Sequence, residues 1–187
     1  LDGQIAFTER DEFVYHEMIA HIPALYHPSP KNILVIGGGD GGACREFLKH
    51  TSIANITVVE IDSTVTAAAR DHFPQIASNL DDFRVQLVHG DGHGFLDAST
   101  ETFDLIVVDS LDTSGDIPFD IQFYSLVRNA LSPDGLCVVQ ITSPTLSPNR
   151  FTSTIRTIRG TFPCVSPFLA FLPTYSTGML SFALASS

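Results

Sequence analysis

The chain of 187 residues is long enough for one domain with a substantial core. Its hydrophobic content of 44% and charged content of 17% exclude the intrinsically disordered class. Its net charge of −11 argues against nucleic acid as a partner, because phosphate binding needs clustered Lys and Arg, whereas an acidic field favours a cationic substrate.

Helical and strand-like patterns alternate along the chain from residue 12 onward. Helical spacing predicts helices over 12–22 (ending before Pro23), 43–50, 64–72, 119–131 (closed by the turn 132–135) and 149–161. Short apolar runs predict strands over 32–36, 56–61, 84–88, 105–108, 136–140, 165–172 and 180–185. This order indicates an α/β fold with a mostly parallel, doubly wound sheet and helices on both faces. Ligands of such sheets bind at the carboxyl ends of the strands.

A glycine-rich loop follows the first predicted strand. Residues 33–42 read Ile-Leu-Val-Ile-Gly-Gly-Gly-Asp-Gly-Gly, so five glycines surround Asp40. Glycines let the backbone turn tightly and let a ligand approach the main chain. A carboxylate in this loop would repel a pyrophosphate and attract a cation, so the loop predicts a nucleoside ligand with positive charge.

Acidic residues recur at the ends of the predicted strands. If the sheet is as predicted, they face one crevice; they are Asp40, Glu60, Asp91, Asp109 and Asp112. Glu60 lies 21 residues after Gly39, close to the separation at which a carboxylate accepts ribose hydroxyl bonds in dinucleotide folds. Asp91, between two glycines, is placed to accept from an adenine amino group. The alternative for each residue is an ordinary solvated position.

Asp109 and Asp112 form the sharpest pair. Two carboxylates three residues apart after a buried strand can hold an amine and take its proton. An alkylammonium has a pKa near ~10.4 and must lose a proton before acting as a nucleophile. The pattern predicts catalysis by Asp109 and amine binding by Asp112, against the alternative that one of them caps the following turn.

The cysteines indicate a reducing compartment. Cys44, Cys137 and Cys164 are widely spaced and form no Cys-x-x-Cys pair, which predicts a cytoplasmic protein without disulfides or structural zinc. No apolar run approaches the ~20 residues of a membrane span, so no membrane partner is expected. We also expect no metal: only His16 of the seven histidines is placed by a motif, and His89 and His93 read as loop or surface residues.

Seven short motifs occur in an order that resembles the spermidine synthases, the polyamine aminopropyltransferase family. They are Leu1-Asp-Gly3, Thr8-Glu-Arg-Asp-Glu-Phe13, Tyr15-His-Glu-Met18, Gly37-Gly-Gly-Asp-Gly-Gly42, Glu60-Ile-Asp62, Gly90-Asp-Gly92 and Pro173-Thr-Tyr175. The resemblance implies a methyltransferase-like Rossmann fold. It also implies transfer of aminopropyl from decarboxylated S-adenosylmethionine, a co-substrate rather than a permanent cofactor, to putrescine. The expected products are spermidine and methylthioadenosine.

The resemblance also implies residue roles. For the donor nucleoside they fall to Gly37, Gly39, Glu60, Asp91 and Gly92. For the substrate amines they fall to Tyr15, His16, Asp40, Asp112, Gln140 and Tyr175, with Asp109 as proton acceptor. Asp40 would repel the carboxylate of ordinary S-adenosylmethionine and hold the ammonium of the decarboxylated donor.

The chain departs from the family pattern in several places. The family has Asp-x-x-Asp-Pro-x-Gly-Pro after the proton acceptor, whereas Thr113 and Asp116 stand here in place of the prolines. Ala6 replaces a family glutamine. We expect a single catalytic domain over 1–187, with a leading segment over 1–22 that follows an absent N-terminal β-rich domain, and a Rossmann-like core over 30–187. Lost terminal parts predict an open crevice, exposed apolar surface or a covering partner, and we expect a homodimer or homotetramer.

Two alternatives remain open at the level of sequence. One is a methyltransferase for small amines that uses S-adenosylmethionine. The other is a degenerate paralogue that binds nucleoside or polyamine without turnover.

Overall fold

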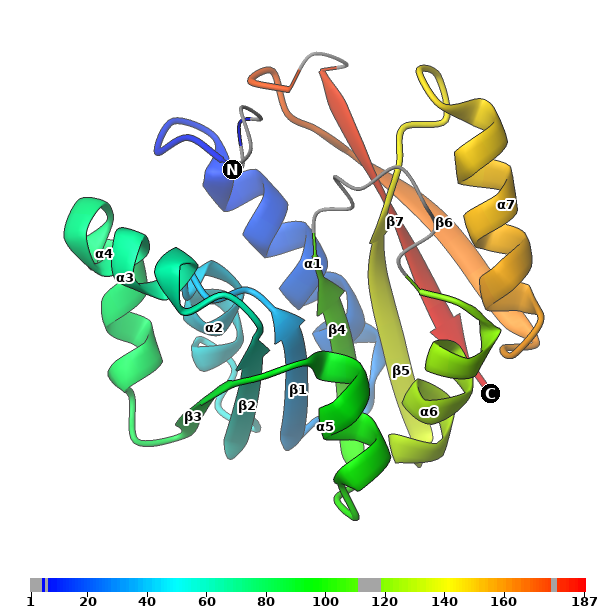
Figure 1. Cartoon of the computed structure of the whole chain (residues 1–187), viewed down its shortest axis with the longest axis horizontal. Helices are drawn as coiled ribbons and strands as arrows, with labels where there is room; N and C mark the ends of the chain where they lie inside the picture. The colour runs from blue at the N-terminus through cyan, green and yellow to red at the C-terminus, as the bar shows by residue number, and fades with distance from the viewer. Residues whose placement is uncertain (1–4, 6, 111–118, 176–177) are drawn as a thin grey trace.

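The computed structural model, which describes residues 5, 7–110, 119–175 and 178–187, is built on a seven-stranded sheet of order β3-β2-β1-β4-β5-β7-β6 (Figure 1). The strands are β1 (Asn32–Gly37), β2 (Asn55–Glu60), β3 (Val85–His89), β4 (Phe103–Asp109), β5 (Leu131–Ile141), β6 (Cys164–Phe171) and β7 (Met179–Ser186). The helices are α1 (Glu12–Tyr26), α2 (Gly42–Leu48), α3 (Ser63–His72), α4 (Pro74–Ala77), the 3-10 helix η1 (Ser78–Asp81), α5 (Gly92–Ala98), α6 (Ile121–Ala130) and α7 (Pro148–Arg159).

The sheet is mostly parallel, as predicted. The strands from β3 through β2, β1 and β4 to β5 run parallel, whereas β7 pairs antiparallel with both β5 and β6. The predicted methyltransferase-like α/β class is therefore confirmed. Because β1, β2 and β4 are adjacent and parallel, the loops that follow them meet at one edge of the sheet.

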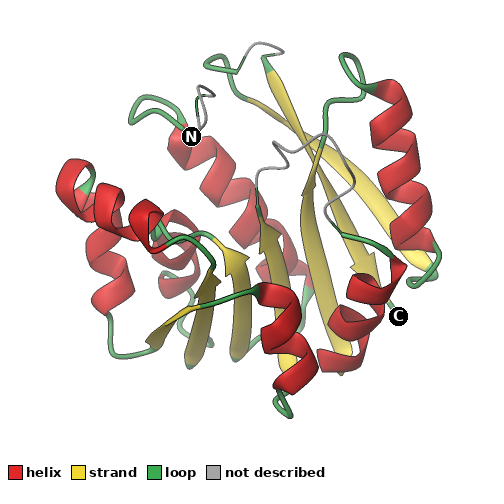
Figure 2. Cartoon of the chain, viewed as in Figure 1, coloured by secondary structure: helices red, strands yellow, loops and turns green. Residues whose placement is uncertain are grey.

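Helices cover both faces of the sheet because its central strands are apolar on both sides (Figure 2). In β1, Ile33 and Val35 join the core that includes α1 and α2 side chains, and Leu34 and Ile36 join the core that includes α6 and α7 side chains. All four are 5% exposed or less. Side chains of adjacent strand residues point to opposite faces. Burial of each contributes roughly 1.5–3 kcal/mol, which commits β1 to the centre.

Helix α1 is longer than the sequence predicted. We expected it to end before Pro23, but it continues to Tyr26. Proline inside a helix removes one backbone hydrogen bond and costs ~3 kcal/mol. Here Pro23 is buried and Ala24 joins the core, so packing outweighs that loss.

The turn expected at 132–135 is instead part of β5. Leu131 pairs with Phe103, and Leu136 pairs with Leu105, with a register shift between them. The four intervening residues are therefore accommodated as an irregularity within the strand, and α6 already ends at Ala130.

Helix α5 was missed by the sequence analysis, as were the short α4 and η1. Gly92 and Gly94 lower the helix propensity of α5. Asp91 compensates by accepting a hydrogen bond from the Gly94 backbone N–H at 2.8 Å, which caps the helix. His93, which we read as a loop or surface residue, is exposed but lies in this helix.

Candidate active site

A cavity of about 540 Å³ lies at the carboxyl ends of the parallel strands. Among the predicted site residues in its lining are Tyr15, His16, Gly37, Gly39, Asp40, Glu60, Asp91, Gly92, Asp109, Gln140 and Tyr175. The structure thus brings together residues from both ends of the chain. Asp112 is the one predicted site residue that lies outside the described residues. Thr113, Asp116, Ala6 and the motif at 1–3 also lie outside them.

The glycine loop allows two close approaches. Gly37 has φ +86°, and a Cβ there would lie 2.0 Å from the Asp109 carbonyl oxygen. A Cβ on Gly42 would lie 2.2 Å from Cε1 of His16. Only glycine permits the strand ends of β1 and β4, and the loop and α1, to meet this closely.

The Asp109 carboxylate stands at the end of β4 and contacts Tyr15. The Tyr15 hydroxyl hydrogen-bonds Oδ1 of Asp109 and lies 3.0 Å from Oε1 of Gln140. Burial and the nearby Asp40 charge raise the pKa of Asp109 to about 6, although His16 and the Tyr15 hydrogen bond act in the opposite direction. Asp109 is therefore mostly ionised above neutral pH and can still accept a proton.

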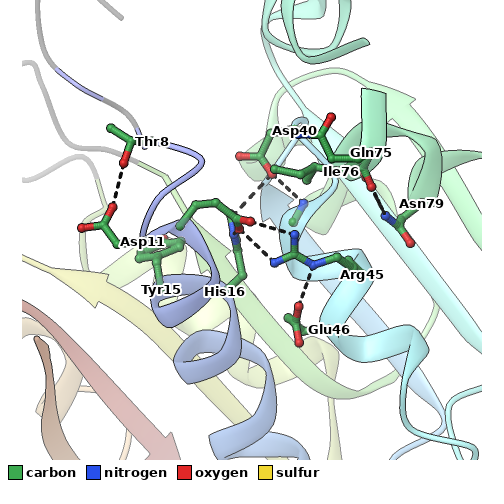
Figure 3. A network of polar contacts seen from close by, with 12 residues as sticks. Thr8, Asp11, Tyr15, His16, Asp40, Arg45, Glu46, Gln75, Ile76 and Asn79 are labelled. Carbon is green, nitrogen blue, oxygen red and sulfur yellow. Dashed lines mark hydrogen bonds and ion pairs between the residues drawn. The ribbon is translucent and has the colours of Figure 1, made fainter. Parts of the chain in front are cut away.

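The Asp40 carboxylate is already paired within the protein. Its Oδ1 accepts a hydrogen bond from the Gly42 N–H at 2.6 Å and lies 3.6 Å from Nε2 of His16 (Figure 3). Burial disfavours the His16 charge, but Asp40 and then Glu12 outweigh it and raise the His16 pKa to about 10. Burial also disfavours the Asp40 charge, yet His16 and the Gly42 N–H lower its pKa. The sequence analysis missed this pairing.

Glu60 and Asp91 hold loops at the cavity wall. Glu60 Oε2 accepts from the Gly39 N–H at 3.1 Å, and Oε1 accepts from the Asp62 N–H at 2.9 Å. Asp91 uses Oδ2 to cap α5. Both carboxylates therefore shape the crevice as well as line it.

Several cavity residues were not assigned by sequence reasoning. They are chiefly apolar, with Asp62, His93 and Ser110 as polar members: Phe7, Ile36, Val59, Ile61, Asp62, Val65, Ala68, Ala69, Phe73, His93, Ser110 and Phe119. The Glu60-Ile-Asp62 motif signalled Asp62, but apolar wall residues carry no pattern that separates them from core. They make a site suited to a ligand with a substantial apolar face.

The strand-end loop that carries Tyr175 is tied to the start of α1. Asp11 Oδ2 accepts from the Thr174 N–H at 3.0 Å, and Asp11 Oδ1 accepts from the Thr8 hydroxyl at 2.8 Å. The Thr8 and Thr174 hydroxyls are 3.2 Å apart. Burial and the Asp109 charge raise the pKa of Tyr175 to about 12. The hydrogen bonds among Thr8, Asp11 and Thr174 therefore hold the loop that places the Tyr175 side chain at the cavity.

Within the residues that the structure describes, no group of three or more His, Cys, Asp or Glu side chains is arranged to hold a metal ion. None of the helices seen in those ranges is both long enough and apolar enough to cross a membrane.

The chain is similar in sequence to a known family domain and to curated proteins. The spermine/spermidine synthase domain matches residues 12–187. The polyamine aminopropyltransferase of Bacillus mycoides (strain KBAB4) is 42% identical over 188 residues, covering 100% of this chain and 68% of that protein. The polyamine aminopropyltransferase of Moorella thermoacetica is 44% identical, covering 100% of this chain and 66% of that protein.

Solved structures agree with the sequence matches. Spermidine synthase from Thermotoga maritima superposes with a TM-score of 0.89 at 38% identity, covering 96% of this chain and 61% of that one. A spermidine synthase in complex with the transition-state analogue AdoDATO gives 0.92 at 39% identity, with 96% and 62% covered. The chain spans about two thirds of the length of these curated relatives. It spans about three fifths of the length of these solved chains. On sequence and fold together, the chain belongs to the spermine/spermidine synthase family.

Proposed function

We propose that the chain is a transferase that moves the aminopropyl group of decarboxylated S-adenosylmethionine to putrescine, giving spermidine and methylthioadenosine. The observation that carries the proposal is that Asp109, Asp40 and Tyr15 line one cavity of about 540 Å³ together with the glycine loop. Family membership supports the same reaction, since relatives are named polyamine aminopropyltransferases.

The reaction needs a proton acceptor and an aligned amine. In the proposed step, ionised Asp109 takes a proton from the acceptor ammonium, whose ordinary pKa is near ~10.4. The freed nitrogen attacks the methylene carbon next to the sulfonium, the carbon–sulfur bond breaks, and its electron pair stays on sulfur as a neutral thioether. Tyr15 donates to Asp109 and so orients the carboxylate. The sulfonium supplies the activation, so alignment is the main task of the protein.

The donor is proposed to lie along the ends of β1, β2 and β3. Gly37 and Gly39 let it approach the backbone, while Glu60 accepts from the ribose hydroxyls. Asp91 and Gly92 bind the adenine. These assignments rest on family motifs together with membership of the cavity lining.

Asp40 is proposed to hold the donor ammonium. Its described contacts with Gly42 and His16 both use Oδ1, which leaves Oδ2 to face the ligand. As an imidazolium, His16 has donors but no acceptor, so we assign it to Asp40 rather than to a substrate nitrogen. This revises the direct contact with substrate that the motif implied for His16.

The acceptor amine is proposed to lie between Asp109, Gln140 and Tyr175. Asp112 is retained as its second anchor on sequence grounds. Cavity depth beyond these residues sets which diamine fits, and putrescine is the acceptor that the family resemblance implies.

We also infer a cytoplasmic homodimer or homotetramer. The three free cysteines support a reducing compartment. Large exposed apolar side chains support self-association; they include Leu25, Tyr26, Phe83 and Phe171. Light scattering of the purified protein tests the assembly, and a monomer at micromolar concentration would contradict it.

Incubation with decarboxylated donor and putrescine tests the reaction. We expect release of methylthioadenosine and spermidine, and loss of both in Asp109→Asn. Binding of donor without product would instead support the degenerate paralogue.

Calorimetry with the two donors tests the methyltransferase alternative. From the sequence, Asp40 was expected to repel the carboxylate of ordinary S-adenosylmethionine. The positive charge of His16 beside Asp40 screens that repulsion, which makes the methyltransferase alternative more favourable than the sequence indicated. Tighter binding of the carboxylated donor would overturn the proposed function.

A further inference from the structure

Beneath the glycine loop, charged side chains of alternating sign continue from Asp40 into the protein (Figure 3). His16 Nδ1 lies 2.6 Å from Oε2 of Glu12. The Arg45 guanidinium donates to both Glu12 oxygens, at 2.8 and 2.9 Å, and through Nε to Glu46 at 2.7 Å. Asp40, His16, Glu12, Arg45 and Glu46 thus form a continuous chain that joins the cavity to α1 and α2.

The two ring nitrogens of His16 both face carboxylates. Nδ1 faces Glu12, and Nε2 faces Asp40 at 3.6 Å. A neutral imidazole has one N–H and one lone pair, so one nitrogen would present its lone pair to a carboxylate. Protons on both nitrogens remove this repulsion, so the geometry favours the imidazolium. Among the charges that act on the ring, Asp109 also favours the imidazolium.

Arg45 keeps the Glu12 side chain ionised, as its pairing with a protonated His16 requires. Glu12 is 6% exposed, and burial alone would disfavour its charge. Hydrogen bonds from His16 and Arg45 outweigh burial and lower the Glu12 pKa. The bidentate fork also fixes the carboxylate plane, since guanidinium and carboxylate match in geometry.

We propose that Glu12 and Arg45 are positioning residues for donor binding: they hold the His16 ring as an imidazolium against Asp40, and so fix Asp40 for the donor ammonium. This inference rests on the proposed function for the identity of the donor. Neither Glu12 nor Arg45 lines the cavity, so both act through His16.

The arrangement also sets the charge beside Asp109. An imidazolium next to Asp40 reduces the repulsion that Asp40 exerts on Asp109, which keeps Asp109 ionised at lower pH. Loss of the His16 charge would therefore raise the pKa of Asp109 and weaken the anchoring of Asp40 together.

The first test follows the His16 ring in the unmodified protein. In histidine-labelled protein, nuclear magnetic resonance should show His16 still protonated at pH 8, with the resonance assigned by its loss in His16→Gln. A titration midpoint near the ordinary ~6.5 would overturn the inference.

The second test compares two ligands by calorimetry. Decarboxylated S-adenosylmethionine carries the ammonium, and methylthioadenosine lacks it. Glu12→Gln and Arg45→Met should each weaken binding of the decarboxylated donor about tenfold, the scale of one charge-assisted hydrogen bond, and change methylthioadenosine binding less than about twofold. Arg45→Lys should recover part of the loss, because a charge without the fork holds Glu12 less well.

Arg70→Met is the matched control. Arg70 pairs with Asp81 at 2.7 Å on the exposed side of α3, outside the cavity lining, so removing it should leave both affinities unchanged. Equal weakening of both ligands in the Glu12 and Arg45 variants would mean general disruption and overturn the inference. If Glu12→Gln does not fold, the positioning role is still tested by the titration of His16 and by the donor affinities of Arg45→Met and Arg45→Lys.

These readouts do not require turnover. A protein that behaves as expected here but releases no methylthioadenosine would contradict the proposed reaction and support the positioning role. A protein that turns over the substrates while His16 is neutral would support the proposed reaction and contradict the positioning role.

Discussion

The Tyr15 hydroxyl of α1 reaches the Asp109 carboxylate at the end of β4, across 94 residues of sequence. Tyr15 is buried and Asp109 is half-buried. The bond is one of two influences that hold the Asp109 pKa down against burial and the Asp40 charge. The proposed proton acceptor therefore has its basicity set by a helix that precedes the sheet.

The pH dependence of the reaction should report Asp109. Its raised pKa of about 6 means that the carboxylate loses its charge as pH falls through 6, and the proposed proton transfer is lost with it. We expect kcat/KM to fall tenfold per pH unit below about 6 in steady-state assays. A limb near the ordinary ~3.9 of an aspartate would contradict the burial argument.

Tyr15→Phe should move this acidic limb to higher pH. The Tyr15 hydrogen bond stabilises ionised Asp109, so its loss raises the pKa of that carboxyl, by about one unit for a bond worth ~1.4 kcal/mol. The measurement is the pH profile of kcat/KM for both proteins. Tyr124→Phe, which removes a buried hydroxyl in the other core, should not shift the limb. A shift to lower pH would contradict the assigned donor.

Gly42→Ala should damage the site through His16. The added Cβ would lie 2.2 Å from Cε1 of a ring that is 1% exposed, so the ring would have to shift away from Asp40 or Glu12. Overpacking of this kind costs typically ~1–3 kcal/mol, so we expect a lower melting temperature and weaker donor binding.

Gly90→Ala is the control for that substitution, because nothing lies within 4 Å of a Cβ at Gly90. Its melting temperature and donor affinity should match those of the parent protein. Equal effects at Gly42 and Gly90 would rule out the His16 contact as the cause.

Asp11→Ala should loosen the Tyr175 loop. The change leaves the Thr174 N–H without its carboxylate partner and costs about 1–3 kcal/mol of folding free energy. Since Tyr175 follows Thr174 directly, we expect a raised KM for the amine with the donor KM unchanged. Asp81→Ala, which breaks an exposed ion pair, should leave both KM values as they were. An unchanged KM for the amine in Asp11→Ala would show that this loop does not contribute to binding of the acceptor amine.

The sequence predicted the strands well because their signal is local. The apolar runs that became β1, β2 and β4 are continuous and bounded by glycine or acidic residues. It failed at α5, where Gly92 and Gly94 hide a helix that Asp91 caps, and at Pro23, where burial outweighs a lost hydrogen bond. Both outcomes depend on contacts that the local sequence pattern does not reveal.

By itself, the sequence determined the parallel order of elements and the acidic residues at the strand ends, because periodicity and strand-end position are properties of short segments. Only the tertiary structure decided the pKa values of two of them, Asp40 and Asp109. Asp40 meets His16 and Asp109 meets Tyr15 because α1 packs against the sheet, and burial there makes each pairing strong enough to shift a pKa.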